Sequence, residues 1–304
     1  MWTIRAFEEK VRDLRLADEI AGSVHLCIGQ ESTAVGGCAG LRPHDALFAT
    51  YRGHGWAIAR GVPLEPLFAE LLGRVHGVNG GRGGSAYFSA GSYGFYGENS
   101  IVGGGVPIAV GAALASRHDG SGRVAVVVFG DGAMNQGSVT EAMNFAAAFD
   151  LPVIFICENN TYSELTPIAD MVRDPDLSKR PAALGIESTR LDGNDVLLLA
   201  EQIGAAVGAA ASGSGPFFFE LSTQRMCGHY IGDAEQYRPA GELDSYLDIE
   251  PIARLSGELA AKGVDADDIS QVETEARAEV NSAAESALRQ PLSDSANARS
   301  HVYA

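Results

Sequence analysis

The feature that most constrains this fold is an apolar segment, residues 123–129, that reads RVAVVVF and ends abruptly in Gly-Asp-Gly. Strands that are apolar on both faces are typical of the centre of a parallel sheet covered by helices. A helical pattern over 138–149 follows, and a second apolar segment comes at 152–158. The same order recurs later in the chain, over 186–193, 196–210 and 216–223. We therefore predict an α/β fold, with a doubly wound, mainly parallel sheet and helices on both faces.

The rest of the chain fits around this pattern as a single domain over 1–304. An amphipathic N-terminal helical arm is expected at 4–20, and a C-terminal helix at 265–289. Between them, 77–105 is dense in glycine, serine and aromatic residues and has almost no periodicity. Long loops of this kind inside a compact domain are more often functional than not.

Charge and cysteine content exclude some classes of function. The chain has 22 Lys and Arg against 39 Asp and Glu, a net charge of -17 that disfavours nucleic acid and anionic membranes. An anionic ligand would need a local site of backbone N–H groups, a metal or a few basic side chains. Four cysteines without CxxC spacing, no signal-peptide pattern and no membrane-length apolar run predict a cytoplasmic protein with reduced thiols.

The first place to look for a site is the carboxyl end of each strand, because ligands of parallel sheets bind there. One predicted strand ends at Gly130-Asp131-Gly132, and the next ends at Glu158-Asn159-Asn160. A right-handed crossover makes such strands parallel and often adjacent, so Asp131 and Asn160 could converge. A carboxylate and an amide oxygen form a partial shell for Mg²⁺, and the glycines would let a diphosphate approach. The alternative is that both motifs are ordinary turns.

Together these motifs resemble a known family. The run GDGAMNQGSVTEAMNFAAAFDLPVIFICENNTYS is similar to the thiamine-diphosphate motif, as found in α subunits of 2-oxo acid dehydrogenases. The resemblance continues through HLCIGQE, YRGHG, GENSIVGGGVP and TQRMCGHYIGDAEQYR, most like the α subunits of acetoin and bacterial pyruvate dehydrogenases. It implies the thiamine-diphosphate-binding fold, with thiamine diphosphate and Mg²⁺ as cofactors.

The resemblance also implies roles for individual residues. Asp131, the Asn160 side chain and the Tyr162 carbonyl would hold Mg²⁺. The further cofactor-binding residues would be Tyr51, Arg52, Ser100, Val102, Gly130, Gly132, Ala133, Arg225 and His229. The expected catalytic residues are His25, His54 and His229.

Several of these residues have a structural alternative. Tyr51 and Arg52 could be a surface pair, His54 a turn residue and His25 a satisfied core histidine. Cys227 could be read as a nucleophile, but no base is placed for it in the sequence.

The resemblance further implies that the site is incomplete. In this family the glutamate that activates the cofactor belongs to a separate β subunit, and neither Glu31 nor Glu98 matches it. We therefore expect a β partner in an α₂β₂ tetramer with the cofactor at the interface, and possible association with a lipoyl acyltransferase. Gln224, Cys227, Tyr230 and Gly232 depart from the family pattern, so phosphorylation is not expected at the last two, and the substrate stays open.

The sequence leaves four candidate functions. The first is the α subunit of a thiamine-diphosphate enzyme that decarboxylates a 2-oxo acid or cleaves acetoin, and passes the acyl unit to a lipoyl carrier or another acceptor. The second is half of a split transketolase or decarboxylase, and the third is a non-catalytic assembly subunit. A dinucleotide-binding oxidoreductase is disfavoured, because the turn after Phe129 lacks GxGxxG.

Overall fold

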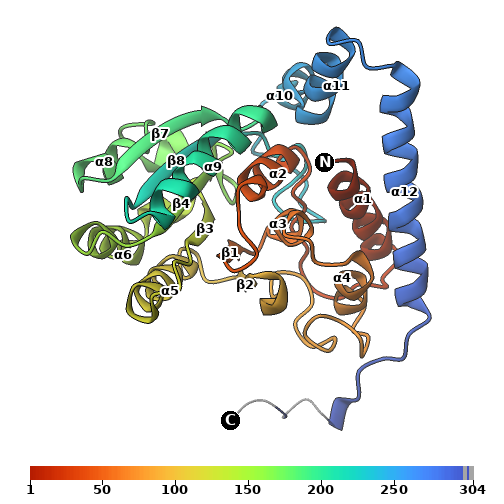
Figure 1. The fold of residues 1–304 in the computed structure, drawn as a ribbon. Helices are drawn as coiled ribbons and strands as arrows, with labels where there is room; N and C mark the ends of the chain where they lie inside the picture. The colour runs from red at the N-terminus through yellow and green to blue at the C-terminus, as the bar shows by residue number, and fades with distance from the viewer. Residues whose placement is uncertain (297–299, 301–304) are drawn as a thin grey trace.

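The computed structural model describes residues 1–296 and 300, and its centre is a six-stranded sheet in which every neighbouring pair is parallel. The strand order is β2-β1-β3-β4-β8-β7 (Figure 1). The strands are β1 (Ala46–Thr50), β2 (Phe95–Asn99), β3 (Ala125–Gly130), β4 (Val153–Asn159), β7 (Glu187–Asp192) and β8 (Phe217–Ser222). The predicted α/β fold with a parallel sheet is confirmed.

Helices cover both faces of the sheet because side chains alternate along each strand. In β3, Val127 and Phe129 pack into one apolar core, and Val126 and Val128 pack into the other. The first core is completed by α5 (Gly105–Asp119) and α6 (Gly137–Ala148). The second is completed by α2 (Glu31–Ala39), α3 (His54–Ala59) and α9 (Val196–Ala211). The predicted doubly apolar strand is therefore a central strand between two helical layers.

Three more helices form a layer at the side of the molecule (Figure 1). The long helix α12 (Ala266–Leu288) packs along α1 (Trp2–Leu16) and α4 (Leu64–Leu71). Its buried stripe includes Val280, Ala284 and Ala287, which confirms the amphipathic C-terminal helix. The remaining elements are β5 (Tyr162–Ser163), β6 (Thr166–Pro167), α7 (Ile168–Met171), α8 (Lys179–Ala183), α10 (Glu242–Tyr246), α11 (Pro251–Ala261), and the 3₁₀ turns η1 (Gly91–Tyr93), η2 (Asp131–Asn135) and η3 (Leu247–Ile249).

The structure differs from the sequence expectations in three places. The N-terminal helix ends at Leu16 rather than at residue 20, because Asp18 adopts a left-handed φ of 59° that stops the helix. The segment 77–105 is not entirely loop, since it contains the edge strand β2. Only two of the five residues of β2 are buried, so it lacks a clear apolar period. Helix α11 was not predicted.

The strand order fixes where a ligand can bind. From β1 the chain moves outward to the edge strand β2, whereas from β3 it moves the opposite way to β4. In open α/β sheets the crevice at such a reversal, beyond the carboxyl ends of the strands, is the usual ligand site. β3 and β4 are adjacent, with Gly130 opposite Glu158. Asp131 and Asn160 therefore follow neighbouring strand ends, as predicted.

The sequence also predicted that the chain has no membrane-spanning segment and that its cysteines are reduced. Within residues 1–296 and 300, no helix is long and apolar enough to span a membrane. Cys27, Cys38 and Cys157 are buried and unpaired, and Cys227 is half-buried and unpaired.

Candidate active site

A cavity of about 310 Å³ lies in the crevice where the strand order reverses. The segments that follow β1, β2, β3, β4 and β8 all contribute to it, together with the loop before α2. Its lining consists of His25, Gln30, Thr50, Tyr51, Arg52, Ser100, Val102, Gly103, Gly130, Asp131, Gly132, Ala133, Glu158, Asn160, Tyr162, Ser163, Glu164, Arg225 and His229. The structure thus brings together every predicted cofactor-binding and metal-binding residue.

The Asp131 carboxylate is the part of the cavity that most needs a ligand. It is 1% exposed, and its Oδ2 has no hydrogen-bond partner among the described residues. Burial raises the pKa of Asp131 to about 6, and the backbone N–H of Gly132 only partly opposes this effect. A buried carboxylate oxygen without a partner fits a hard cation such as Mg²⁺, which prefers oxygen ligands.

Asn160 and Tyr162 stand beside this carboxylate on the next strand end. The Asn160 Nδ2 donates to Gln30 Oε1 at 3.1 Å, and its Oδ1 accepts from the Tyr162 backbone N–H at 3.3 Å. Tyr162 begins a small hairpin of β5 and β6 that packs against the Gly-Asp-Gly turn. A side chain at Gly132 would collide with Ser163, so glycine is required there for close packing.

Arg52 links the three loops that surround the cavity. Its guanidinium donates to the carbonyl oxygen of Leu26 and, at 3.0 Å, to that of His229. The neighbouring Tyr51 ring packs 4.6 Å from the His25 ring and 5.8 Å from the His229 ring, measured between centroids. The two imidazole rings are themselves 4.9 Å apart. Three rings and one guanidinium therefore form a preorganised wall.

Both imidazoles of this wall are neutral at pH 7. Burial, and next the Arg52 charge, lower the pKa of His25 to about 3. Burial followed by Arg52 and Arg225 lowers the pKa of His229 to about 4. The His229 Nδ1 lies 3.1 Å from Arg225 Nη1, and a guanidinium can only donate, so Nδ1 accepts and the proton sits on Nε2. His229 is therefore a neutral hydrogen-bond donor through Nε2.

Arg225 is held in a polar and aromatic network that orders the loop after β8. Its guanidinium lies 5.6 Å from the Tyr162 ring centroid and 5.9 Å from that of Tyr237, and it donates to the Tyr237 hydroxyl at 2.6 Å. Asp233 accepts from that hydroxyl at 2.8 Å and from the His229 backbone N–H at 2.7 Å. The position of His229 is thus fixed through both its ring and its backbone.

His54 is the predicted catalytic residue that the structure does not bring to the cavity. It is fully buried, with Nδ1 at 3.0 Å from Glu8 Oε2 and Nε2 at 3.0 Å from Ser85 Oγ. Burial alone would lower the pKa of His54, but the Glu8 carboxylate outweighs burial and raises it. His54 is better explained as part of a buried hydrogen-bonded chain that joins α1, α3 and the glycine-rich loop.

Three other residues singled out in the sequence also lie outside the cavity lining. Glu31 is paired with Arg5, and Glu98 accepts from the Phe88 backbone N–H at 3.0 Å. Burial raises the pKa of Cys227 to about 11, so its thiol is protonated at neutral pH and is a poor nucleophile.

Six residues that line the cavity were not predicted as site residues: Gln30, Thr50, Gly103, Glu158, Ser163 and Glu164. Gln30 lies in HLCIGQE, and Glu158 directly precedes the Asn-Asn pair, so both were within quoted motifs. Glu164 occupies the hairpin turn after Tyr162 with a left-handed φ of 56°. Position at or after a strand end was the available signal for all of them except Gln30, which directly precedes α2.

The chain is similar in sequence to a known family and to several of its members. Residues 1–295 match the family model described as dehydrogenase E1 component. The α subunit of acetoin:2,6-dichlorophenolindophenol oxidoreductase from Bacillus subtilis (strain 168) is 38% identical over 273 residues, which cover 90% of this chain and 82% of that protein.

Two pyruvate dehydrogenase subunits are similarly related. The pyruvate dehydrogenase E1 component subunit α of Zymomonas mobilis is 39% identical over 294 residues, covering 96% of this chain and 83% of that protein. The somatic mitochondrial form from Homo sapiens is 37% identical over 306 aligned residues, covering 100% of this chain and 77% of that protein. The chain therefore belongs to the dehydrogenase E1 component family.

Proposed function

We propose that this protein is the α subunit of a thiamine-diphosphate-dependent dehydrogenase that acts on a 2-oxo acid such as pyruvate, or on acetoin. Family membership and the names of the relatives support this activity. The observation that carries the proposal is the cavity at the strand reversal, where the buried Asp131 carboxylate has an oxygen without a partner among the described residues.

Each part of the cavity would hold a different part of the cofactor. Asp131, Asn160 and the Tyr162 carbonyl would bind Mg²⁺, and Arg52 with the backbone of Gly132 and Ala133 would bind the diphosphate. Tyr51 and Gly130 would complete the diphosphate side, and the backbone at Ser100 and Val102 would bind the aminopyrimidine. Bound thiamine diphosphate supplies a carbon nucleophile and an electron sink.

The two neutral histidines would act on the substrate side. His229 would donate a hydrogen bond from Nε2 to a substrate oxygen, since Arg225 occupies Nδ1. His25 has a buried Nδ1 without a partner in the described part of the chain, so it can bind a polar substrate group. Their low pKa values would keep both rings in the neutral form across the physiological range.

A β subunit would complete the site by supplying the activating glutamate, in an α₂β₂ tetramer. The helices α5 and α6 pack against each other beside the sheet (Figure 1), and these helices with the segments next to them form an exposed surface that carries several large apolar side chains. Its exposed large side chains are Ile101, Val102, Ile108, Phe145 and Phe149. Such a surface fits coverage by another chain. The proposal includes a cytoplasmic location and transfer of the acyl unit to a lipoyl acyltransferase.

Reconstitution tests the proposal. The chain alone, with thiamine diphosphate and Mg²⁺, is expected to be inactive, and addition of its β partner is expected to give dye reduction with pyruvate or acetoin. Reductive acylation of lipoamide by the complex would separate a dehydrogenase from a split transketolase or decarboxylase. Pyruvate turnover by the isolated chain would refute the incomplete site. A complex that binds the cofactor but converts neither substrate would favour an assembly subunit.

A further inference from the structure

Thr161 lies between the two proposed metal ligands that follow β4, and its backbone conformation is unusual. Its φ of 68° is left-handed. This conformation is uncommon for any residue except glycine, and for a β-branched side chain it is a genuine outlier. Such a conformation persists only where the surrounding structure holds it. The contacts of Thr161 therefore determine how the chain turns from Asn160 to Tyr162.

Two hydrogen bonds to its backbone hold Thr161 in this conformation. Its N–H donates to Asn159 Oδ1 at 3.1 Å, and its carbonyl oxygen accepts from the Ile168 N–H at 2.8 Å. Thr161 itself is exposed, so burial of its side chain does not hold it. Asparagine side chains commonly close turns by accepting from the backbone two residues on. Of the two contacts, only the one to Asn159 is made by a side chain and can be removed by substitution.

The Asn159 amide is held in one direction from both ends. Its Nδ2 donates to Glu220 Oε1 at 2.8 Å, while its Oδ1 accepts from the Thr161 N–H. Glu220 is fully buried; its Oε2 accepts from the Ser178 N–H at 3.0 Å and lies 3.3 Å from Arg190 Nε. A backbone N–H can only donate and an ionised carboxylate can only accept. A reversed amide would therefore place two donors together at one end and two acceptors together at the other.

Asn159 is buried but is not among the residues that line the cavity, so it acts through the backbone rather than on a ligand. We infer that Asn159 is a positioning residue, which holds Thr161 in the left-handed conformation and thereby places the Tyr162 carbonyl at the metal site. Glu220 orients the Asn159 amide for this role. The inference rests on the proposed function, because the metal site is part of it.

Manganese binding to the full chain with its β partner tests the inference. Mn²⁺ is titrated at saturating thiamine diphosphate, and free Mn²⁺ is followed by electron paramagnetic resonance. Asn159→Ala removes the acceptor and should raise the Kd for Mn²⁺ by about 10- to 100-fold, as is typical of residues that orient a metal ligand. The melting temperature of the metal-free protein is the structural readout. A lower melting temperature with an unchanged Kd would show a purely structural role and would overturn the inference.

The hydration of bound Mn²⁺ tests the Tyr162 carbonyl directly. In water enriched in ¹⁷O, each water ligand broadens the paramagnetic resonance signal of the bound ion. Asn159→Ala should add a water ligand, because water replaces a displaced carbonyl oxygen in the shell of such hard cations. Equal hydration of Mn²⁺ in the variant and the wild type would mean that the carbonyl stays in place, which would overturn the inference.

Thr161→Gly tests the conformational step. Glycine adopts a left-handed φ at no steric cost, so the Asn159 acceptor should matter less in this background. There, Asn159→Ala should raise the Kd for Mn²⁺ by less than about threefold. An equally large effect in both backgrounds would mean that Asn159 does not act through the conformation of Thr161, and the inference would fail.

Asp119→Ala is the matched control. Asp119 Oδ1 also accepts from the backbone N–H two residues on, that of Ser121 at 2.8 Å, in the turn before β3 at the opposite edge of the sheet. The same kind of contact is therefore removed away from the metal site, and the Kd for Mn²⁺ should change by less than about twofold.

Exchange of the two side chains tests the part played by Glu220. In Asn159→Asp alone, two carboxylates face each other, and Mn²⁺ binding should weaken. When Glu220→Gln is added, the glutamine NH₂ donates to the new carboxylate, whose other oxygen still accepts from the Thr161 N–H. The exchanged pair should bind Mn²⁺ within about threefold of the wild type. If it binds no better than Asn159→Asp alone, Glu220 does not orient this side chain and its role is overturned.

Asp131→Asn distinguishes the two levels of the proposal. If Asp131→Asn loses Mn²⁺ binding while Asn159→Ala binds as tightly as the wild type, the inference about Asn159 is overturned and the proposed metal site stands. If Asp131→Asn binds Mn²⁺ normally, the proposed metal site itself is overturned, and the role of Asn159 with it.

Discussion

Two buried aspartates lie at opposite ends of the same sheet, and they differ in how their charge is compensated. Asp45 directly precedes β1, and Asp131 directly follows β3, the neighbouring strand. Asp45 is fully buried and Asp131 is 1% exposed. Even so, the pKa of Asp45 is lowered, whereas that of Asp131 is raised to about 6.

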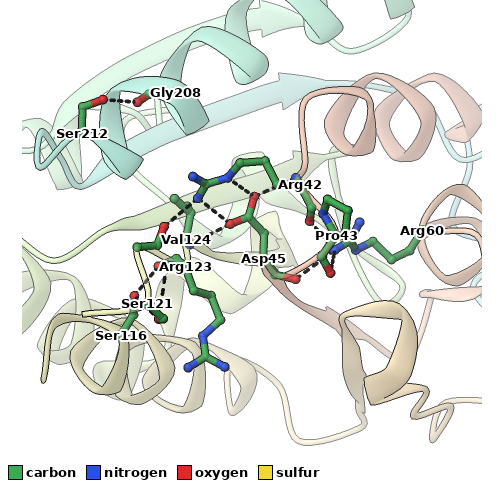
Figure 2. Close-up of polar contacts among 11 residues, drawn as sticks. Arg42, Pro43, Asp45, Arg60, Ser116, Ser121, Arg123, Val124, Gly208 and Ser212 are labelled. Atoms are coloured by element: carbon green, nitrogen blue, oxygen red, sulfur yellow. Dashed lines mark hydrogen bonds and ion pairs between the residues drawn. The ribbon is translucent and has the colours of Figure 1, made fainter. Parts of the chain in front are cut away.

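At the amino-terminal edge of the sheet, every oxygen of Asp45 is used (Figure 2). One oxygen accepts from the Val124 backbone N–H at 2.9 Å and from Arg42 Nη2 at 2.7 Å, and the other accepts from the Arg42 backbone N–H and Nε. Arg60 donates to the Asp45 backbone carbonyl at 3.0 Å. Burial alone would raise the pKa of Asp45, but the donors of Arg42 and the Val124 backbone N–H together outweigh it.

At the carboxyl-terminal edge, compensation is incomplete. In the described part of the chain, Asp131 Oδ2 has no hydrogen-bond partner. Three nitrogen atoms that belong to cavity-lining residues also have none: His25 Nδ1, Gln30 Nε2 and Arg225 Nε. Buried polar groups are normally paired, so a cluster of exceptions within one cavity indicates a binding site. Burial alone therefore does not distinguish these two acids; the difference lies in how completely hydrogen bonds and a cation compensate the carboxylate.

The largest expected effect is on cofactor binding. Asp131→Ala removes the carboxylate proposed to bind the metal, and should weaken Mg²⁺-dependent binding of thiamine diphosphate at least about 100-fold, or roughly 3 kcal/mol. Isothermal titration calorimetry with and without Mg²⁺ measures this loss, and circular dichroism should show an intact fold. Unchanged affinity of the variant for thiamine diphosphate would show that Asp131 does not bind the metal.

Asp45→Asn should have the opposite pattern, with a large loss of stability and normal cofactor binding. The new NH₂ group would face the donors of Arg42 or Val124, and Arg42, whose side chain is 35% exposed, would lose its anion. Leaving such buried donors unsatisfied typically costs about 1–3 kcal/mol of unfolding free energy, which urea unfolding measures. Asp119→Asn, at an exposed pair with Arg123, is the control and should leave the unfolding curve unchanged. A stable Asp45→Asn protein would argue against a structural role for this network.

The pH dependence of the cofactor-free protein should reveal the uncompensated acid. The folded-state pKa of Asp131, about 6, exceeds the ordinary value of 3.8. Its protonated form therefore stabilises the fold below pH 3.8, and this contribution disappears as the pH rises through 6. Asp131→Asn should equal the wild type near pH 3.5 and exceed it by about 3 kcal/mol at pH 7.

Comparison of these two proteins at each pH cancels the contributions of other groups. The depressed pKa values of His25 and His229 destabilise both proteins equally as the pH falls below about 6.5. Urea unfolding at several pH values without metal or cofactor measures the difference. A constant difference from pH 3.5 to 7 would contradict a raised pKa for Asp131.

The sequence predicted the elements whose signal is local. Contiguous patterns in the sequence mark the strands that are apolar on both faces, the Gly-Asp-Gly turn and the Asn-Asn pair. The parallel sheet and the two neighbouring strand ends could therefore be predicted from the sequence. β2 was missed because an edge strand with mixed burial has no apolar period. Its Gly97, at a φ of 133°, further weakens the pattern typical of a strand.

The missed side chains depend on contacts between distant parts of the chain. Gln30 meets Asn160 across 130 residues, and His54 meets Glu8 across 46. Neither pairing has a period or a fixed spacing, because packing of different layers creates it. The sequence could therefore indicate which residue types belong to the site, but not that His54 pairs with Glu8 and lies outside the cavity lining.

The smallest expected effect tests how Asp45 is compensated. Arg42 binds Asp45 through Nε and Nη2, and the same Nη2 also reaches the Gly122 carbonyl at 2.8 Å. Arg42→Lys keeps the positive charge but offers one point of contact, so it should lose the fork and the link to the turn before β3. The expected cost is about 1 kcal/mol by urea unfolding, with cofactor binding unchanged. Arg42→Lys could instead prove as destabilising as Asp45→Asn. The two-nitrogen geometry of the guanidinium, and not merely a positive charge, would then compensate the Asp45 carboxylate. In that case Asp45 and Asp131 would differ in hydrogen-bond geometry.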